Sequence, residues 1–211
     1  MVYYDCPNLC TFVLNGLTDS LRSLDWTAGK RFDIVVVSIN PDETPRLAAS
    51  KKAAYVESYE RGGGHVHSAA GWHFLTGEQS QIRELASQVG FHYRASSDAG
   101  RGGERARQFA HGSAIYVLTP GGKISRYLYG IEFRPRDVRL ALLEASDGKI
   151  GTPLDRFLSF CYRYDPRSRH YEAAPNRAIA VSAGAGGAGT VLVFAGFLAV
   201  VRRRDKEKER A

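Results

Sequence analysis

Cysteine is scarce in this sequence: its 211 residues contain only Cys6, Cys10 and Cys161. So few cysteines exclude a small scaffold held together by disulfides. Two of them are close together and the third is distant, which favours a local pair with a chemical role and one leftover thiol. Phe and Tyr surround Cys161 in FLSFCYRYDP, and we expect it to be a small buried hydrophobic residue.

A concentrated basic surface is also missing. The formal net charge is +7, but the tail RRRDKEKERA (202–211) contributes +3 of it, with six Lys or Arg against three acidic residues. No stretch combines dense Lys and Arg with aromatic residues, so we expect no nucleic-acid partner. There are no internal repeats, and a composition of 44% apolar and 24% charged residues is typical of a globular domain with a core.

An export signal is missing from the N-terminus, where MVYYD has no basic region, apolar core or cleavage site. A long uncharged run, IAVSAGAGGAGTVLVFAGFLAVV, occupies residues 179–201 near the other end. As a helix it would span about 34 Å, enough to cross a hydrocarbon core of ~30 Å. The run therefore predicts a single transmembrane helix; a Gly-rich linker followed by a short buried strand is the alternative.

Flanking charges suggest how this helix is oriented. More Lys and Arg follow it than precede it, so we expect the tail in the cytoplasm and the domain on the extracytoplasmic, periplasmic side of the inner membrane. That topology needs an export signal, so we expect the sequence to be truncated at its N-terminus or its start to be assigned too late. The expected organisation is a domain at 1–171, a linker at 172–178, the membrane helix at 179–201 and the basic tail at 202–211.

Hydrophobic patterning predicts strands that alternate with helices through the first 145 residues. The expected helices cover residues 9–24, 45–59, 78–90 and 135–145. The expected strands end at residue 4, cover 31–39, 72–77 and 90–93, and form a hairpin within 114–130, while 147–171 is expected to be irregular. Alternating units imply a mainly parallel sheet with helices on both faces, and a final hairpin and helix are what a thioredoxin-like fold adds.

The cysteine pair, CPNLC, stands where a strand gives way to a helix. Backbone N–H groups and the helix dipole favour a thiolate at such a position, so we expect both thiols to be reactive. The spacing is CxxxC rather than the redox spacing CxxC. Two thiols on one helical turn also suit a soft metal such as copper, or zinc, so metal binding, redox chemistry and a coincidental pair all stay open.

A metal would need a further ligand, and six histidines could supply it. His111 ends the loop before SAIYVLT, and in a thioredoxin-like layout this loop folds back towards the first strand–helix junction. His65 and His67, in HVH, could chelate a metal from a loop, although exposed loop histidines are more common. We expect the remaining histidines to be packing or surface residues, namely His73, His92 and His170.

Several blocks of the sequence resemble the SCO/SenC family of copper proteins. They are YYDCPNLCTFVLNGL, VVVSINPDETP, KKAAYVESY, GWHFLTG, QFAHGSAIYVLTPGGKISRYLYGIEF and FCYRYDP. The resemblance covers about residues 2–171, and a membrane helix after YDP resembles a bacterial subgroup. The family often has Asp where this chain has Asn40, and it normally has an export signal or anchor and an additional strand region before the cysteines.

The resemblance implies a thioredoxin-like fold and a copper metallochaperone, with thiol-reductase activity left open as a second role. In the family, one copper ion, Cu(I) or Cu(II), is bound by the two cysteines and one histidine, which are Cys6, Cys10 and His111 here. The implied partner is the CuA-bearing subunit of cytochrome c oxidase, or another copper protein. Only the resemblance singles out His111 among the six histidines.

Two other functions remain for the cysteine pair. In a membrane-anchored thiol–disulfide oxidoreductase, Cys6 would attack a substrate disulfide and Cys10 would resolve it. In a structural module, the pair would be a disulfide, but so short a loop restrains little unfolded-state entropy. A peroxidase is disfavoured because Tyr3, rather than Thr or Ser, stands three residues before the first cysteine.

Overall fold

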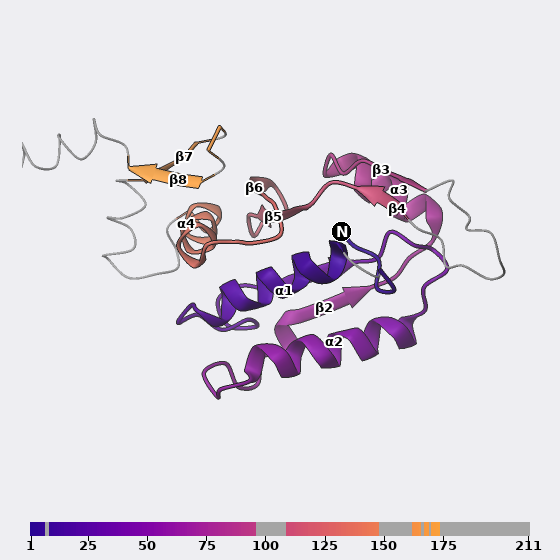
Figure 1. The fold of residues 1–211 in the computed structure, drawn as a ribbon, viewed down its shortest axis with the longest axis horizontal. Coiled ribbons are helices and arrows are strands. Elements are labelled where there is room, and N and C mark those ends of the chain that lie inside the picture. Colours follow the sequence, from indigo (N-terminus) through magenta and orange to yellow (C-terminus); the bar gives the residue numbers. More distant parts are fainter. Residues whose placement is uncertain (7–8, 96–108, 148–161, 166, 169, 174–211) are drawn as a thin grey trace, which may run out of the picture. The chain divides into compact units, whose positions relative to one another are not determined.

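The computed structural model describes residues 1–6, 9–95, 109–147, 162–165, 167–168 and 170–173 (Figure 1). The chain divides into two units, Met1–Arg156 and Phe157–Ala211. In the part of the chain that is described, no helix is long and apolar enough to cross a membrane. The predicted membrane helix at 179–201 and tail at 202–211 lie outside the described residues, as do Cys161 and residues 96–108 of the loop before His111.

The second unit contains a short hairpin. Strand β7 (Tyr162–Asp165) pairs antiparallel with β8 (His170–Ala173). The prediction of irregular structure up to residue 171 is therefore wrong at this point. Tyr164 and Tyr171 are paired across the two strands, and their rings meet edge to face at 5.4 Å.

A parallel pair of strands forms the centre of the first unit. Strand β1 (Ile34–Val37) lies parallel to β2 (Trp72–Leu75), with Ile34 opposite Trp72. Val2 bridges to Ser38 just beyond β1, through Val2 N–H to the Val37 carbonyl at 3.0 Å and Ile39 N–H to the Val2 carbonyl at 2.7 Å. This pairing brings the residues before Cys6 to the carboxyl end of β1.

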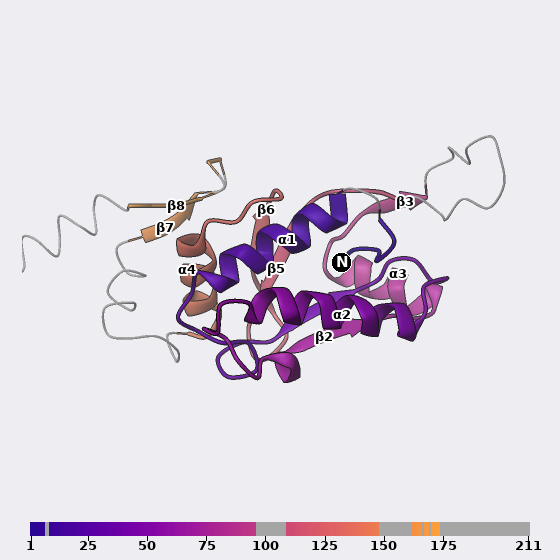
Figure 2. The ribbon, with the colours of Figure 1, turned by 60° about the horizontal axis from the view of Figure 1, so that its bottom comes forward.

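Helix α2 (Pro45–Glu60) packs against β2 and begins as its sequence predicts (Figures 1 and 2). Thr44 is the N-cap, and its side chain accepts a hydrogen bond from Leu47 N–H at 3.3 Å, while Pro45 occupies the first turn. Its last turn buries Tyr59 completely against Trp72, with ring centroids 5.4 Å apart. Two aromatic rings from elements separated in sequence thus fix the helix on the strand.

Antiparallel pairing dominates the rest of the first unit. Helix α3 (Gln79–Gln88) ends before Gly90, as predicted, and leads into β3 (Tyr93–Ala95), which pairs with β4 (Phe109–His111). Strands β5 (Ala114–Leu118) and β6 (Ile124–Tyr129) form the predicted hairpin, and Gly122 adopts a φ of 78° in its turn. Among the described strands, only β1 and β2 pair in parallel, with two isolated parallel bridges, Val2–Ser38 and Ala28–Phe32, so the prediction of a mainly parallel sheet is wrong for them.

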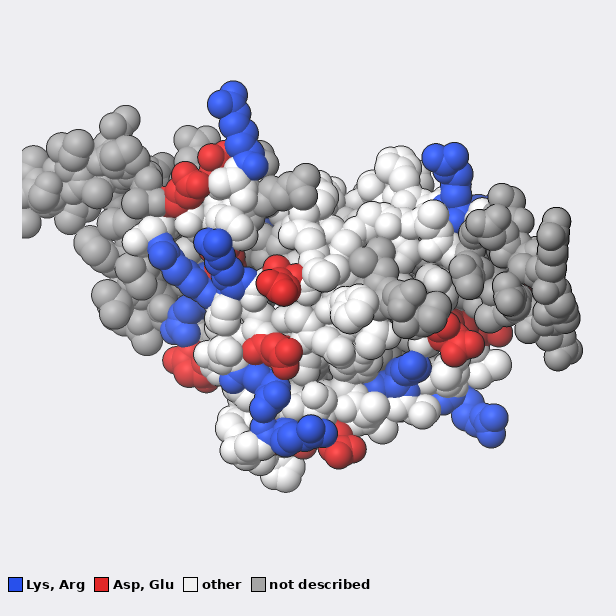
Figure 3. Space-filling model, viewed as in Figure 1, with Lys and Arg blue, Asp and Glu red and all other residues white. Residues whose placement is uncertain are grey.

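Two further helices enclose this unit. Helix α4 (Pro135–Ala145) packs on the β5–β6 hairpin through its buried apolar residues Val138, Leu140, Ala141 and Leu143. Helix α1 (Leu9–Arg22) buries Val13, Leu14 and Leu21. On the face seen in Figure 3, Lys and Arg are interspersed with Asp and Glu rather than gathered in one patch.

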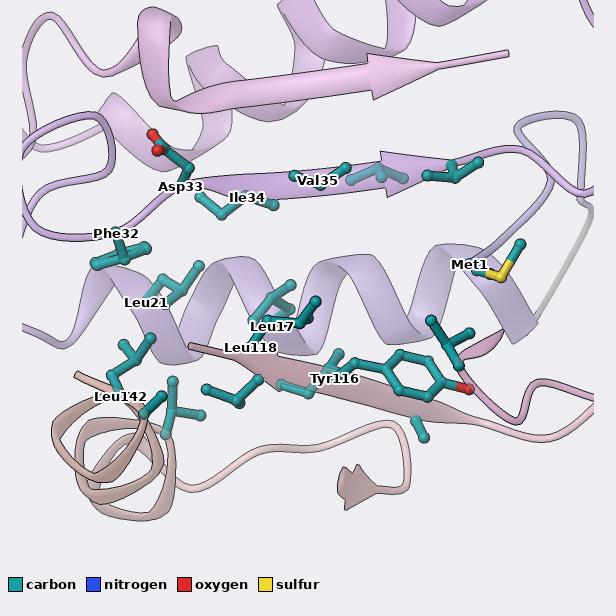
Figure 4. Close-up of a pocket in the computed structure, with 18 of the residues that line it drawn as sticks. Met1, Leu17, Leu21, Phe32, Asp33, Ile34, Val35, Tyr116, Leu118 and Leu142 are labelled. Atoms are coloured by element: carbon teal, nitrogen blue, oxygen red, sulfur yellow. The ribbon is translucent and has the colours of Figure 1, made fainter. Parts of the chain in front are cut away.

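An apolar groove of about 580 Å³ separates β1 from β5. Figure 4 shows its lining by side chains of β1, α1 and β5, among them Ile34, Val35, Leu17, Leu21, Tyr116 and Leu118. Val35 and Leu118 remain 59% and 46% exposed, so the groove is open to solvent. Strands β1 and β2 form one pair and β5 and β6 another, rather than one continuous sheet.

Helix α1 touches the segment after β6 so closely that only glycine fits at the contact. A Cβ built on Gly16 would lie 1.9 Å from the Ile131 carbonyl oxygen. Alanine is the better helix former, so propensity alone would favour Gly16→Ala by about 1 kcal/mol. Because the clashing atom belongs to the backbone, we expect the opposite sign, a loss of roughly 1–3 kcal/mol in the free energy of unfolding, measured by urea denaturation.

Gly64→Ala is the matched control, because a Cβ there meets nothing within 4 Å. We expect this variant to change the free energy of unfolding by less than about 0.5 kcal/mol. Equal stability of the two variants would contradict the close approach of α1 to Ile131.

Candidate metal centre

Cys10 lies in the first turn of α1, and Cys6 precedes the helix. Cys10 is 2% exposed, and its Sγ accepts a hydrogen bond from Tyr3 N–H at 3.5 Å. The half-buried Cys6 places its own Sγ 3.5 Å from Cys10 N–H. No disulfide joins Cys6 and Cys10. Two thiols, one in the first turn of the helix and one just before it, thus have their sulfur atoms held by backbone N–H groups.

His111 lies beside this pair although it follows Cys10 by 101 positions in the sequence. It ends β4, opposite Tyr93 in β3, and its Nε2 lies 3.2 Å from Cys10 Sγ. Its Nδ1 lies 2.7 Å from the Gly112 carbonyl oxygen, which can only accept a hydrogen bond. In the neutral imidazole the proton is therefore on Nδ1, and the lone pair of Nε2 faces the thiol.

Aromatic rings surround the imidazole and limit its movement. Phe91 and Tyr3 lie with their centroids 5.5 and 6.3 Å from that of His111. Phe109, in the same strand as His111, meets Tyr3 edge to face at 5.4 Å. Tyr3 thus contacts both parts of the site, since its backbone N–H binds Cys10 and its ring packs beside His111.

Burial weakens the acidity of the Cys10 thiol. It raises the pKa of the Cys10 thiol to about 12, and although the hydrogen bond from Tyr3 N–H opposes this shift, the neighbouring Cys6 adds to it. Burial and the nearby Cys6 also raise the pKa of Tyr3. The expectation that both thiols are reactive is therefore wrong for Cys10, because burial raises its pKa more than the Tyr3 N–H hydrogen bond lowers it.

The three predicted ligands lie near one another, and the donor atoms of Cys10 and His111 are in direct contact. In the described ranges, no three His, Cys, Asp or Glu side chains are grouped tightly enough to form a ready metal cage. Cys10 and His111 are in contact, and Cys6 stands beside Cys10. Cys10 Sγ and His111 Nε2, 3.2 Å apart, would supply one sulfur and one nitrogen donor to a shared metal ion.

Of the other four histidines in the first unit, only His65 is buried. His65 is 6% exposed and stacks on Tyr59 with a centroid distance of 4.5 Å, while its ring nitrogens face Thr27 Oγ1 and the Arg22 carbonyl at 3.4 and 3.1 Å. It is a packed, hydrogen-bonded residue rather than a loop ligand. His67, His73 and His92 are exposed, and His170 belongs to the hairpin of the second unit.

One residue of the site was missed by the sequence analysis. Glu43 is 8% exposed and hydrogen-bonds to the backbone N–H groups of Tyr4 and Asp5, immediately before Cys6. The signal was present in the sequence, because Glu43 follows a buried strand at the same sheet edge as the cysteines. The sequence does not reveal the pairing of Val2 with Ser38, and without knowledge of that pairing Glu43 could not be distinguished from an exposed carboxylate.

Together these features define a class: a mixed α/β protein in which two thiols at a strand-to-helix junction meet an imidazole. The family model for SCO1/SenC matches residues 1–143, and the chain belongs to this family. The family is associated with copper binding, copper chaperones and redox chemistry, and the mixed α/β fold is consistent with its thioredoxin-like domain.

Two solved structures from Aquifex aeolicus VF5 are similar to this chain. One, described as a candidate electron transfer protein, has 20% identity and a TM-score of 0.55 and covers 70% of this chain and 76% of its own. The other, described as a candidate electron transport protein, has 19% identity and a TM-score of 0.51, with coverages of 69% and 77%. At these identities the likeness shows the fold alone. A comparison with curated proteins finds no match.

The raised pKa of Cys10 predicts an unusual alkylation profile. At pH 8 only about one Cys10 in 10⁴ is a thiolate if the pKa is about 12, so iodoacetamide should modify it very slowly. Its rate should rise about tenfold per pH unit from pH 7 to 9.5 without levelling off. Peptide mapping by mass spectrometry separates Cys10 from the other two cysteines.

The same protein unfolded in urea is the control, because there Cys10 should titrate near its ordinary value of about 8.5. A Cys10 rate in the folded protein that reaches a plateau below pH 9 would show that burial does not govern this thiol.

Proposed function

We propose that this protein is a copper metallochaperone that binds one copper ion through Cys6, Cys10 and His111. The observation that carries the proposal is the 3.2 Å approach of His111 Nε2 to Cys10 Sγ across 101 positions of sequence, beside a second thiol. Membership of the SCO1/SenC family supports copper as the ion.

The donor set suits copper chemically. Two thiolates and one neutral imidazole would hold Cu(I) in a three-coordinate site, or Cu(II) with an added ligand. Binding requires the thiol protons to leave, so affinity should increase with pH. The carbonyl of Gly112 keeps the Nδ1 proton in place and leaves Nε2 ready to bind.

The proposed acceptor is the dinuclear CuA centre of cytochrome c oxidase, or another copper protein. Ligand exchange between Cys6, the half-buried thiol, and the acceptor's cysteines would begin the transfer. In this proposal the thioredoxin-like domain is held at the inner membrane by residues 179–201, on the extracytoplasmic side. These details extend the resemblance and come from the sequence rather than from the described residues.

A thiol–disulfide oxidoreductase acting through Cys6 and Cys10 is the competing function. The site gives it less support, because such an enzyme needs two thiols and leaves the contact between Cys10 and His111 without a role. The two activities make different predictions for His111, which the following experiment uses.

Replacing any ligand should remove stoichiometric copper. We expect the full-length protein to hold one copper per chain by elemental analysis, and Cys6→Ala, Cys10→Ala and His111→Ala to fall well below one. His73→Ala is the matched control, since His73 is exposed and belongs to β2 rather than to α1 or β4, and it should bind like the parent.

The disulfide-reduction rate of His111→Ala completes the test, because an oxidoreductase that acts through Cys6 and Cys10 should keep its rate when His111 is lost. Tight stoichiometric copper in any of the three ligand variants would overturn the site. Turnover of a disulfide substrate that needs both cysteines, in a parent that binds no copper, would establish the oxidoreductase instead.

A further inference from the structure

The loop NPDETP, which the proposed function does not use, presents a buried carboxylate to the cysteine junction. Glu43 accepts three hydrogen bonds, from Tyr4 N–H and Asp5 N–H at 2.8 Å each and from Ser38 Oγ at 2.6 Å. All three partners donate, which is the arrangement that an ionised carboxylate needs. One side chain thus ties the end of β1 to the two residues before Cys6.

The loop itself is built to hold this carboxylate in place. The Asn40 side-chain oxygen accepts from Asp42 N–H at 3.1 Å, and the Asn40 carbonyl accepts from Glu43 N–H at 3.2 Å. Ser38 Oγ, besides donating to Glu43, accepts from Asn40 N–H at 3.0 Å. Immediately after the loop, Thr44 caps α2. Glu43 therefore extends from a short turn that is fixed at both ends.

The side chain of Tyr4 is also held in place by hydrogen bonds. Its hydroxyl lies 2.7 Å from the Leu75 carbonyl and 3.1 Å from the Val36 carbonyl, at the ends of β2 and β1. With Glu43 on its backbone, Tyr4 is held at both ends and is 3% exposed. The chain therefore enters Asp5 and Cys6 from a defined position and direction.

The position of Cys6 depends more on the backbone of Tyr4 and Asp5 than the position of Cys10 does. Cys10 lies within α1 and is held by the helix and by Tyr3 N–H, whereas Cys6 precedes the helix and is half-buried. Glu43 hydrogen-bonds to backbone atoms of this segment, the N–H groups of Tyr4 and Asp5 immediately before Cys6.

We propose that Glu43 is a positioning residue of the copper site, which fixes the backbone before Cys6 and so directs that thiol towards Cys10 and His111. This inference rests on the proposed function. It assigns the NPDETP loop to the metal centre without making any of its atoms a ligand. In Glu43→Gln the new NH₂ group faces N–H or O–H donors, so at least one of the three hydrogen bonds is lost.

Glu43→Gln should weaken Cu(I) binding by about 10- to 100-fold, the usual effect of losing a partner that orients a metal ligand. Competition with a colorimetric Cu(I) chelator measures the affinity in the full-length protein. The Cu(II) form should show altered electron paramagnetic resonance and thiolate charge-transfer absorption. Glu57→Gln is the matched control, because Glu57 is an exposed carboxylate on α2, and it should leave all three measurements unchanged.

Double variants separate positioning from general destabilisation. If Glu43 acts through Cys6, Glu43→Gln should weaken copper binding no further in a Cys6→Ala background but should keep its full effect in a His111→Ala background. An unchanged affinity and unchanged spectra in Glu43→Gln, with only a lower urea midpoint, would overturn the proposal. So would equal effects in both backgrounds.

Alkylation keeps the test independent of copper. If the parent protein binds no copper, the proposed function fails, yet Glu43→Gln should still change the alkylation rate of Cys6 at least several-fold relative to Glu57→Gln. No change in that rate would overturn the positioning role as well.

Discussion

The contact between Cys10 and His111 is the constraint on which the site depends. It joins the first turn of α1 to the end of β4, and both partners are held by neighbouring backbone atoms, Cys10 by Tyr3 N–H and His111 by the Gly112 carbonyl. Tyr3 packs against the imidazole as well. Movement of either element would therefore be felt at both donors, and the fold around them serves to keep the sulfur and the nitrogen facing each other.

Local patterns in the sequence were enough to predict most elements of the first unit. Thr44 and Pro45 marked the start of α2, Gly90 marked the end of α3, and Pro-Gly-Gly marked the β5–β6 turn, because each signal acts within a few residues. The CxxxC pair was also visible for the same reason. These predictions needed no knowledge of what packs against what.

The features that escaped prediction all depend on distant partners. Strand β4 exists through its pairing with β3, and His65 is buried because Tyr59 and the Arg22 carbonyl happen to lie beside it. Burial likewise reversed the expected acidity of Cys10, since a helix dipole is a local property and hydration is not. Spacing alone left His111 as one histidine of six; the family resemblance, rather than periodicity, selected it.

The distance in sequence between Cys10 and His111 has a thermodynamic consequence. An ion held by both residues would close a loop of about 100 residues, and a covalent cross-link of that span removes an amount of chain entropy from the unfolded state worth about 4.7 kcal/mol on the simplest model. A bound ion would thus act as a reversible cross-link across most of the first unit. Binding of the ion would therefore stabilise the whole unit against unfolding, and its loss would remove that stabilisation.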